Sequence, residues 1–301
     1  MASSSNTLRI IAMPAGMVVG ALLCRQVAWV DGVMRGWMTP AFIFLMLFFT
    51  FCRVDARRIR FSWMHLWLLL FQMVGSVAIY YALEWCDVVV AQGAMVCVLA
   101  PVAMAAVVIG GMLGANVATM VTYSLLCNIV TALIAPFILH HFGNGECTFM
   151  DIFSRVVPTL VAPFVVAQLL RWLWRKGAEW VTAHSYLSFY LWLISLVLVL
   201  GRTTAFILDT EASLLIEIEL ALVALLLCFV QFAIGRWLGR MAGDEVAGGQ
   251  SVGQKNTILA VWMSLNFLDP IVSIAPTAYI VWQNFVNSYQ IYSYDKKQRR
   301  K

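Results

Sequence analysis

Charged side chains are what this sequence has least of. Only 12% of its 301 residues are Asp, Glu, Lys or Arg, whereas 62% are hydrophobic. Ordinary globular proteins carry about twice that charged fraction, so a soluble domain of this size could not cover its surface. The apolar residues fall in runs of about 16 to 22, close to the roughly 20 residues that cross a bilayer core. We therefore expect an all-α integral membrane protein whose partner is the lipid bilayer.

Patterns that hold metals or carry out catalysis are also lacking. The seven cysteines are scattered without a Cys-x-x-Cys pair, and most lie in apolar runs, as small buried hydrophobic residues do. The adjacent His140 and His141 cannot share one helix face. No nucleophile stands beside a base, and no phosphate-binding loop is visible. We expect no metal site, no cofactor and no enzymatic activity.

The amino-terminal segment is unlike a cleaved signal. Arg9 alone supplies positive charge, Pro14 interrupts the apolar stretch, and Leu23 before Cys24 is large for a processing site. We interpret this segment as the first of ten membrane spans. The predicted spans are 8–28, 37–52, 62–83, 88–110, 115–140, 155–174, 185–208, 214–238, 249–268 and 271–291.

The basic residues predict the orientation of these spans. Cytoplasmic loops carry an excess of Lys and Arg, and with ten spans every basic cluster falls on one side. Both termini are then cytoplasmic, in a cytoplasmic (inner) membrane, and the basic tail 292–301 is a membrane anchor rather than a nucleic-acid arm. The clusters are Arg53, Arg57, Arg58 and Arg60; Arg171, Arg175 and Lys176; Arg236 and Arg240; and Lys296, Lys297, Arg299, Arg300 and Lys301.

Ten spans divide into two halves of five, 1–140 and 155–291. An odd number of helices per half gives the halves opposite orientations, which is the inverted-repeat plan of many transporters. The fourth span of the first half contains Pro101, and the fourth span of the second half begins with Gly248, Gly249 and Gly253. Interrupted helices at matching positions mark transporter binding sites, although a proline kink and a glycine-rich loop are the simpler interpretation. We expect broken helices four and nine to cross at their interruptions.

At these positions the chain resembles the bile acid:sodium symporter family. Residues 251–260, Ser-Val-Gly-Gln-Lys-Asn-Thr-Ile-Leu-Ala, are similar to that family's ninth-helix motif, and Pro101, the segment 114–118, Asn128 and Pro136 are similar to its fourth and fifth helices. The resemblance implies a core of spans 3–5 and 8–10 and a panel of spans 1, 2, 6 and 7. It also implies solute transport by alternating access between them.

The resemblance also shows where this chain departs from sodium-coupled members. Their span-nine Glu corresponds to Ser251 and their span-nine Gln to Lys255, unless Gln254 takes the latter place. Of their other sodium ligands, Gln72 is the counterpart that survives intact. The remaining counterparts are Ala106, Val107, Met120 and Ser124. Because Ala, Val and Met offer no oxygen ligand and Lys255 would repel a cation, we expect no sodium at these sites.

Lys255 is the leading candidate site residue. Inserting a lysine into a membrane costs free energy, so such a residue usually has a function. In one interpretation the Lys255 ammonium replaces a sodium ion and joins the two broken helices where they cross. Burial disfavours the charged form, which would allow proton coupling. In the simpler interpretation Lys255 reaches the cytoplasmic surface and pairs with Asp244 or Glu245. Candidate residues beside it are Ser251, Gln254, Asn256, Gln72, Ser124, Asn116 and Pro101.

These features predict a secondary transporter for a small organic solute, an anion attracted by Lys255 and by the amino-terminal ends of broken helices. Two alternatives stay open. A metalloid exporter of related fold would use a thiol such as Cys97 in span four. A membrane sensor or non-transporting subunit would fold without moving a solute.

Overall fold

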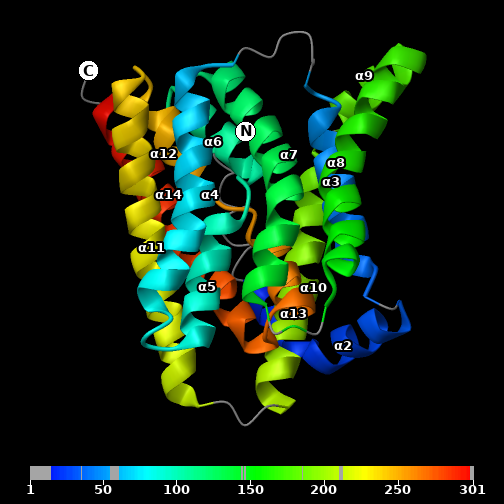
Figure 1. The fold of residues 1–301 in the computed structure, drawn as a ribbon. Coiled ribbons are helices and arrows are strands. Elements are labelled where there is room, and N and C mark those ends of the chain that lie inside the picture. Colours follow the sequence, from blue (N-terminus) through cyan, green and yellow to red (C-terminus); the bar gives the residue numbers. More distant parts are fainter. Residues whose placement is uncertain are drawn as a thin grey trace. The chain divides into compact units, whose positions relative to one another are not determined.

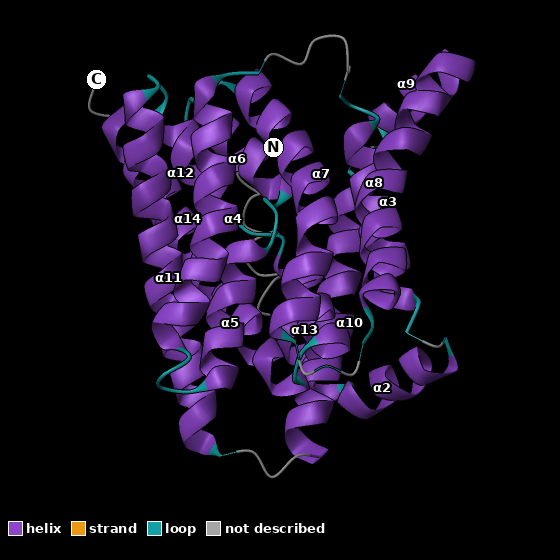
Figure 2. Cartoon of the chain, viewed as in Figure 1, coloured by secondary structure: helices purple, strands orange, loops and turns teal. Residues whose placement is uncertain are grey.

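All regular structure in the described part of the chain is helical. The structure, a computed structural model, describes residues 15–34, 36–54, 61–143, 145, 147–184, 186–209 and 213–298 (Figures 1 and 2). A helix over Ala15–Leu22 comes first. It is followed by α2 (Cys24–Val33), α3 (Met38–Phe51), α4 (Trp63–Leu83), α5 (Val88–Leu99), α6 (Met104–Met112), α7 (Val117–Phe142), α8 (Phe149–Leu173), α9 (Arg175–Ala183), α10 (Leu187–Asp209), α11 (Leu214–Met241), α12 (Glu245–Gly253), α13 (Thr257–Phe267), the 3₁₀ turn η2 (Pro270–Ser273) and α14 (Ile274–Gln298).

Five described helices are long and apolar enough to cross a membrane: α4, α7, α8, α10 and α11. A sixth span results if Ala15–Leu22 and α2 are counted together, although they meet at a bend of 73°. Helices α3, α5 and α13 are apolar but shorter. The integral membrane character predicted from composition therefore agrees with the fold, whereas ten spans in inverted repeats remain a prediction.

The predicted first span, 8–28, is not one straight helix in its described part. Residues 8–14 lie outside the described residues, and beyond Ala15 the chain bends at Leu23 instead of continuing straight. The second piece is polar: Arg25 lies 3.9 Å from Asp209, and buried Asp31 forms a 3.1 Å ion pair with Arg202. Both contacts join α2 to α10.

The chain forms two compact units, and each takes residues from both halves of the sequence. Unit 1 contains Met1–Arg53 and Ala162–Ala212, and unit 2 contains Val54–Val161 and Ser213–Lys301. Unit 2 therefore holds predicted spans 3–5 and 8–10, and unit 1 holds predicted spans 1, 2 and 7 with most of span 6. This division corresponds to the core and panel that the resemblance implied. The repeats 1–140 and 155–291 are a separate division, and they remain a prediction.

Short polar side chains cap the start of four helices of unit 2. Asp87, Asn116, Asp244 and Asn256 each accept a backbone N–H bond at the start of α5, α7, α12 and α13, respectively. Such caps satisfy donors that a helix leaves open at its amino-terminal end. The sequence thus marks where these four helices begin.

Candidate crossing site

Two broken helices of unit 2 meet at their interruptions. Helix α5 is separated from α6 by residues 100–103, and α12 is separated from α13 by residues 254–256. The Ala103 amide donates to the Gln254 carbonyl at 2.9 Å, and the Asn256 amide donates to the Pro101 carbonyl at 2.7 Å. Figure 2 shows non-helical links inside the bundle rather than at its ends. We call residues 100–103 and 254–256, the two links between half-helices, the crossing. Each link forms hydrogen bonds with backbone groups that the other link leaves without helical partners.

Lys255 lies inside the crossing. The residue is 1% exposed, and its Nζ donates to the Val98 carbonyl at 2.8 Å. Its own amide donates to the Gln283 side-chain oxygen at 2.9 Å, and an antiparallel bridge joins it to Val102. The ammonium therefore ties the end of α5 to the link that follows α12.

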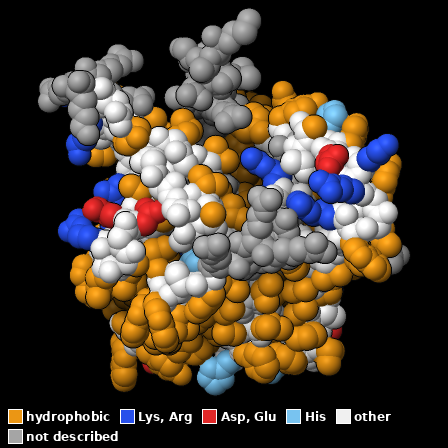
Figure 3. All heavy atoms as spheres, turned by 90° about the horizontal axis from the view of Figure 1, so that it is seen from above, with side chains coloured by type: hydrophobic (Ala, Val, Ile, Leu, Met, Phe, Trp, Pro, Cys, Tyr) orange, Lys and Arg blue, Asp and Glu red, His pale blue; other side chains and the backbone are white. Residues whose placement is uncertain are grey.

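The simpler interpretation of Lys255, an exit to the surface, does not agree with the structure. Glu245 instead pairs with Arg240 at 3.0 Å and Arg236 at 3.7 Å. Asp244 accepts the Ala247 and Asn116 amides. Figure 3, the view from above, shows Lys, Arg, Asp and Glu side chains exposed at one end of the molecule.

Gln72 supports the other side of the crossing. This fully buried amide on α4 donates to the Leu99 carbonyl at 2.9 Å and to the Ala100 carbonyl at 3.0 Å. Its oxygen accepts from the Tyr123 hydroxyl at 3.0 Å and the Cys127 thiol at 3.2 Å. Gln72 thus satisfies two carbonyls that the break after α5 leaves without helical partners.

The structure places most other predicted site residues at or near the crossing. Ser251 and Gln254 are buried near the end of α12, and the Ser251 hydroxyl and the Gln254 side-chain oxygen have no hydrogen-bond partner. Asn256 caps α13. Buried Ser124 on α7 donates to the Met104 sulfur at the start of α6, at 3.2 Å.

Asn116 lies elsewhere. It follows α6, whose nine residues rise about 13 Å from the break. Its amide donates to Asp244 at 2.8 Å, and both residues line a cavity of about 490 Å³ with Ser62, Trp63 and Thr119 among its walls. The turns before Asn116 and Asp244 contain Gly114 and Gly243, whose φ angles of 87° and 85° favour glycine. Asn116 therefore belongs to the end of the bundle and not to the crossing.

The predicted role of Gly248 and Gly249 as helix breakers is wrong. Both lie within α12, which continues to Gly253. A β-carbon on Gly248 would lie 2.6 Å from the Gly239 α-carbon and still closer to the Gly235 carbonyl oxygen. The glycines therefore permit backbone contact between α11 and α12, and the helix breaks later, at residues 254–256.

Sequence reasoning missed three polar residues that support the crossing. Gln283 on α14 accepts the Lys255 amide. Tyr279, on the same helix, donates to the Gly253 carbonyl at 2.8 Å, and Gln231 on α11 donates to the Tyr279 hydroxyl at 3.1 Å. Each is a buried polar side chain in an apolar segment, which is the signal that could have identified it.

The partial charges of four helix ends meet at the crossing. The carboxyl-terminal ends of α5 and α12 carry partial negative charge, and the amino-terminal ends of α6 and α13 carry partial positive charge. Lys255 follows α12 directly and donates to a carbonyl near the end of α5. A buried ammonium thus lies at the two negative ends.

Comparison with known families agrees with this architecture. A model of the SBF-like CPA transporter family matches residues 53–286. The chain belongs to this family. The resemblance to bile acid:sodium symporters is thereby confirmed, and membership indicates an integral membrane transporter. A search of curated proteins finds no significant match.

Proposed function

We propose that this family member is a secondary transporter in which Lys255 replaces a coupling sodium ion. The observation that carries the proposal is the ammonium, 1% exposed and bonded at 2.8 Å to the Val98 carbonyl within the crossing. A lysine at the centre of a membrane helix costs about 2.5–3.5 kcal/mol on insertion scales. Ser251 stands where the resemblance implied a carboxylate, and Lys255 supplies the positive charge in place of a bound cation.

The proposed mechanism is alternating access by a ten-span, inverted-repeat protein in the cytoplasmic membrane with both termini cytoplasmic. The two compact units would supply the two bodies that move, and the crossing would stay intact within unit 2. We propose protons as the coupling ion and Lys255 as the group that exchanges them.

For the solute we propose a small organic anion that also carries hydroxyl or amino groups. The amino-terminal ends of α6 and α13 favour negative charge. Buried side-chain oxygens of unit 2 lack a donor, two of them at or near the crossing, and hydroxyl or amino groups of the solute would satisfy those that it reaches. They include the oxygens of Asn128, Thr131, Ser251 and Gln254.

Sodium dependence is the first test. The thermal unfolding midpoint of the purified protein is compared in KCl and NaCl at equal ionic strength and pH. A ligand at 100 times its dissociation constant stabilises a protein by about 2.7 kcal/mol, so a bound sodium ion would raise the midpoint in a saturable way. We expect equal midpoints in the two salts; a saturable rise in NaCl would contradict the proposal.

The role of Lys255 is tested in proteoliposomes. Lys255→Met keeps an unbranched side chain that is only slightly shorter, but removes the charge and the bond to the Val98 carbonyl. We expect a folded protein without proton-driven uptake of organic anions, while Arg25→Gln, at an exposed position outside the crossing, keeps uptake. Unchanged uptake and stability in Lys255→Met would refute the role. Equal transport of a neutral analogue would refute the anion preference alone.

A further inference from the structure

The corner between α8 and α9 in unit 1 has a rigid side and an exposed side. Helix α8 is an apolar, membrane-capable helix of 25 residues, about 37 Å long. That length exceeds the roughly 30 Å of a hydrocarbon core, so its end reaches the headgroup region. Helix α9 begins directly afterwards, beyond Trp174.

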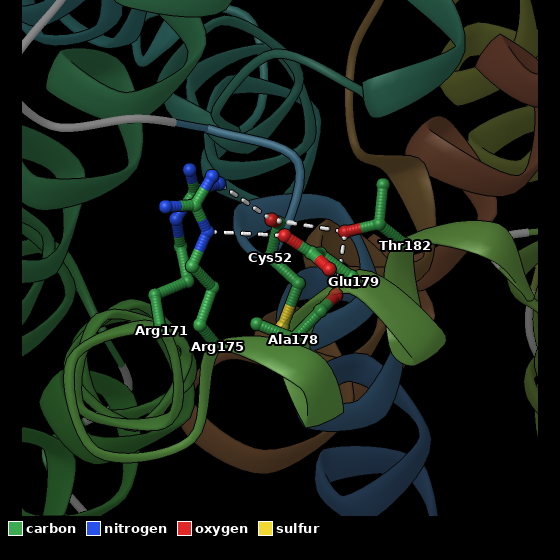
Figure 4. Close-up of polar contacts among 6 residues, drawn as sticks. All are labelled: Cys52, Arg171, Arg175, Ala178, Glu179 and Thr182. Atoms are coloured by element: carbon green, nitrogen blue, oxygen red, sulfur yellow. Dashed lines mark hydrogen bonds and ion pairs between the residues drawn. The ribbon is translucent and has the colours of Figure 1, made fainter.

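The rigid side is a clamp on the last turn of α3. The Cys52 carbonyl accepts from Arg171 Nη1 at 2.9 Å and lies 3.2 Å from the Thr182 hydroxyl, which is also 2.8 Å from the Ala178 carbonyl (Figure 4). Gly177, Ala178 and Val181 form the buried face of α9. This clamp fixes the direction in which the other faces of α9 point.

The exposed side combines aromatic rings with positive charge. Trp172, Trp174 and Trp180 are 76%, 64% and 60% exposed. Exposed Lys176 lies beside Arg175, which pairs with Glu179 at 3.0 Å (Figure 4). Together with Arg53 and Arg171, the corner carries four cations and one carboxylate, a net charge of +3. Tryptophan favours the membrane interface, and clustered Lys and Arg attract anionic headgroups.

We propose that this corner, defined as residues 171–184 with Arg53, binds the headgroups of anionic phospholipids. The tryptophans would lie at headgroup depth, and Arg175 and Lys176 would contact lipid phosphates. Glu179 holds Arg175 in place without cancelling the charge of the corner. The bound lipid would then hold the ends of α3, α8 and α9 at one membrane surface.

Lipid binding to the full-length protein tests this proposal. Native mass spectrometry of the detergent-solubilised protein yields apparent dissociation constants for phosphatidylglycerol and for phosphatidylcholine. Each basic residue near an anionic surface contributes about a fivefold factor, so Arg175→Gln with Lys176→Gln should weaken phosphatidylglycerol binding roughly 30-fold. Binding of phosphatidylcholine should not change. Added salt should weaken phosphatidylglycerol binding to the unsubstituted protein more than to the variant.

Arg25→Gln is the matched control. Arg25 is also an exposed arginine of unit 1 with an acidic neighbour, Asp209 at 3.9 Å. We expect this variant to bind phosphatidylglycerol like the unsubstituted protein. Equal loss in Arg25→Gln, or undiminished binding in the double variant, would overturn the proposal. So would equal affinity for the two lipids, or complete displacement of phosphatidylglycerol by millimolar inorganic phosphate, which would point to a site for the free ion.

Discussion

Replacing Gly248 by alanine tests the contact that positions α12. The added β-carbon would lie 2.6 Å from the Gly239 α-carbon and 2.8 Å from the Gly239 nitrogen. Carbon atoms pack at about 3.5–4.0 Å, so α12 must move about 1 Å from α11. The neighbouring atoms are backbone, and no change of rotamer relieves the overlap.

The expected cost lies at the upper end of the range for overpacking, about 3 kcal/mol. At about 2 °C per kcal/mol, the low end for chains of 150–250 residues, the unfolding midpoint falls by roughly 6 °C. Differential scanning fluorimetry of the purified protein measures this shift. Because α12 leads directly to the bond between Gln254 and Ala103, uptake should fall as well.

Neighbouring Gly249 supplies the matched control. Its β-carbon would meet the Arg236 side chain, with Cγ at 2.5 Å, and this side chain can move aside. Gly249→Ala should therefore lower the midpoint by less than Gly248→Ala does. If the two variants unfold at the same temperature, or if Gly248→Ala unfolds like the unsubstituted protein, backbone contact does not hold α12 in place.

Three further substitutions test other contacts by the same thermal measurement. Gln72→Leu removes the amide that bonds two carbonyls at the end of α5 and should lower the free energy of unfolding by at least about 2 kcal/mol. An unchanged unfolding midpoint would mean that the helix break needs no side-chain support. Asp87→Ala removes the cap of α5 and should cost about 1 kcal/mol, and Asp87→Asn should restore most of it. Asp31→Asn leaves the Arg202 charge without its partner and should lower the free energy of unfolding by about 3 kcal/mol. The double variant Asp31→Leu with Arg202→Met should recover most of that loss. Full stability of Asp31→Asn would show that the ion pair is not needed.

Helix positions were largely predictable because length and apolar composition determine them. The predicted ranges 37–52, 62–83 and 214–238 correspond closely to α3, α4 and α11. Pro101 indicated the first break correctly, since proline removes a donor that a continuous helix needs. Such local signals require no knowledge of what each segment packs against.

The remaining features depend on partners that are distant in the sequence. Gly248 is a packing residue because Gly235 and Gly239 lie opposite it, and the bend at Leu23 goes with the ion pair between Asp31 and Arg202. Lys255 was found because a charge in an apolar segment stands out. Its acceptor, the Val98 carbonyl, is a backbone group that no residue type could have indicated.

The bond between Lys255 and Val98 joins residues 157 positions apart. During synthesis, the link after α5 is therefore complete long before its partner leaves the ribosome. Until then the Val98 and Pro101 carbonyls lack their partners in the second link, and backbone groups at membrane depth need other partners. Maturation of this protein thus has a late step, in which α12 and α13 arrive and close the crossing, and a chain truncated before residue 254 would be left with an open helix break inside the membrane.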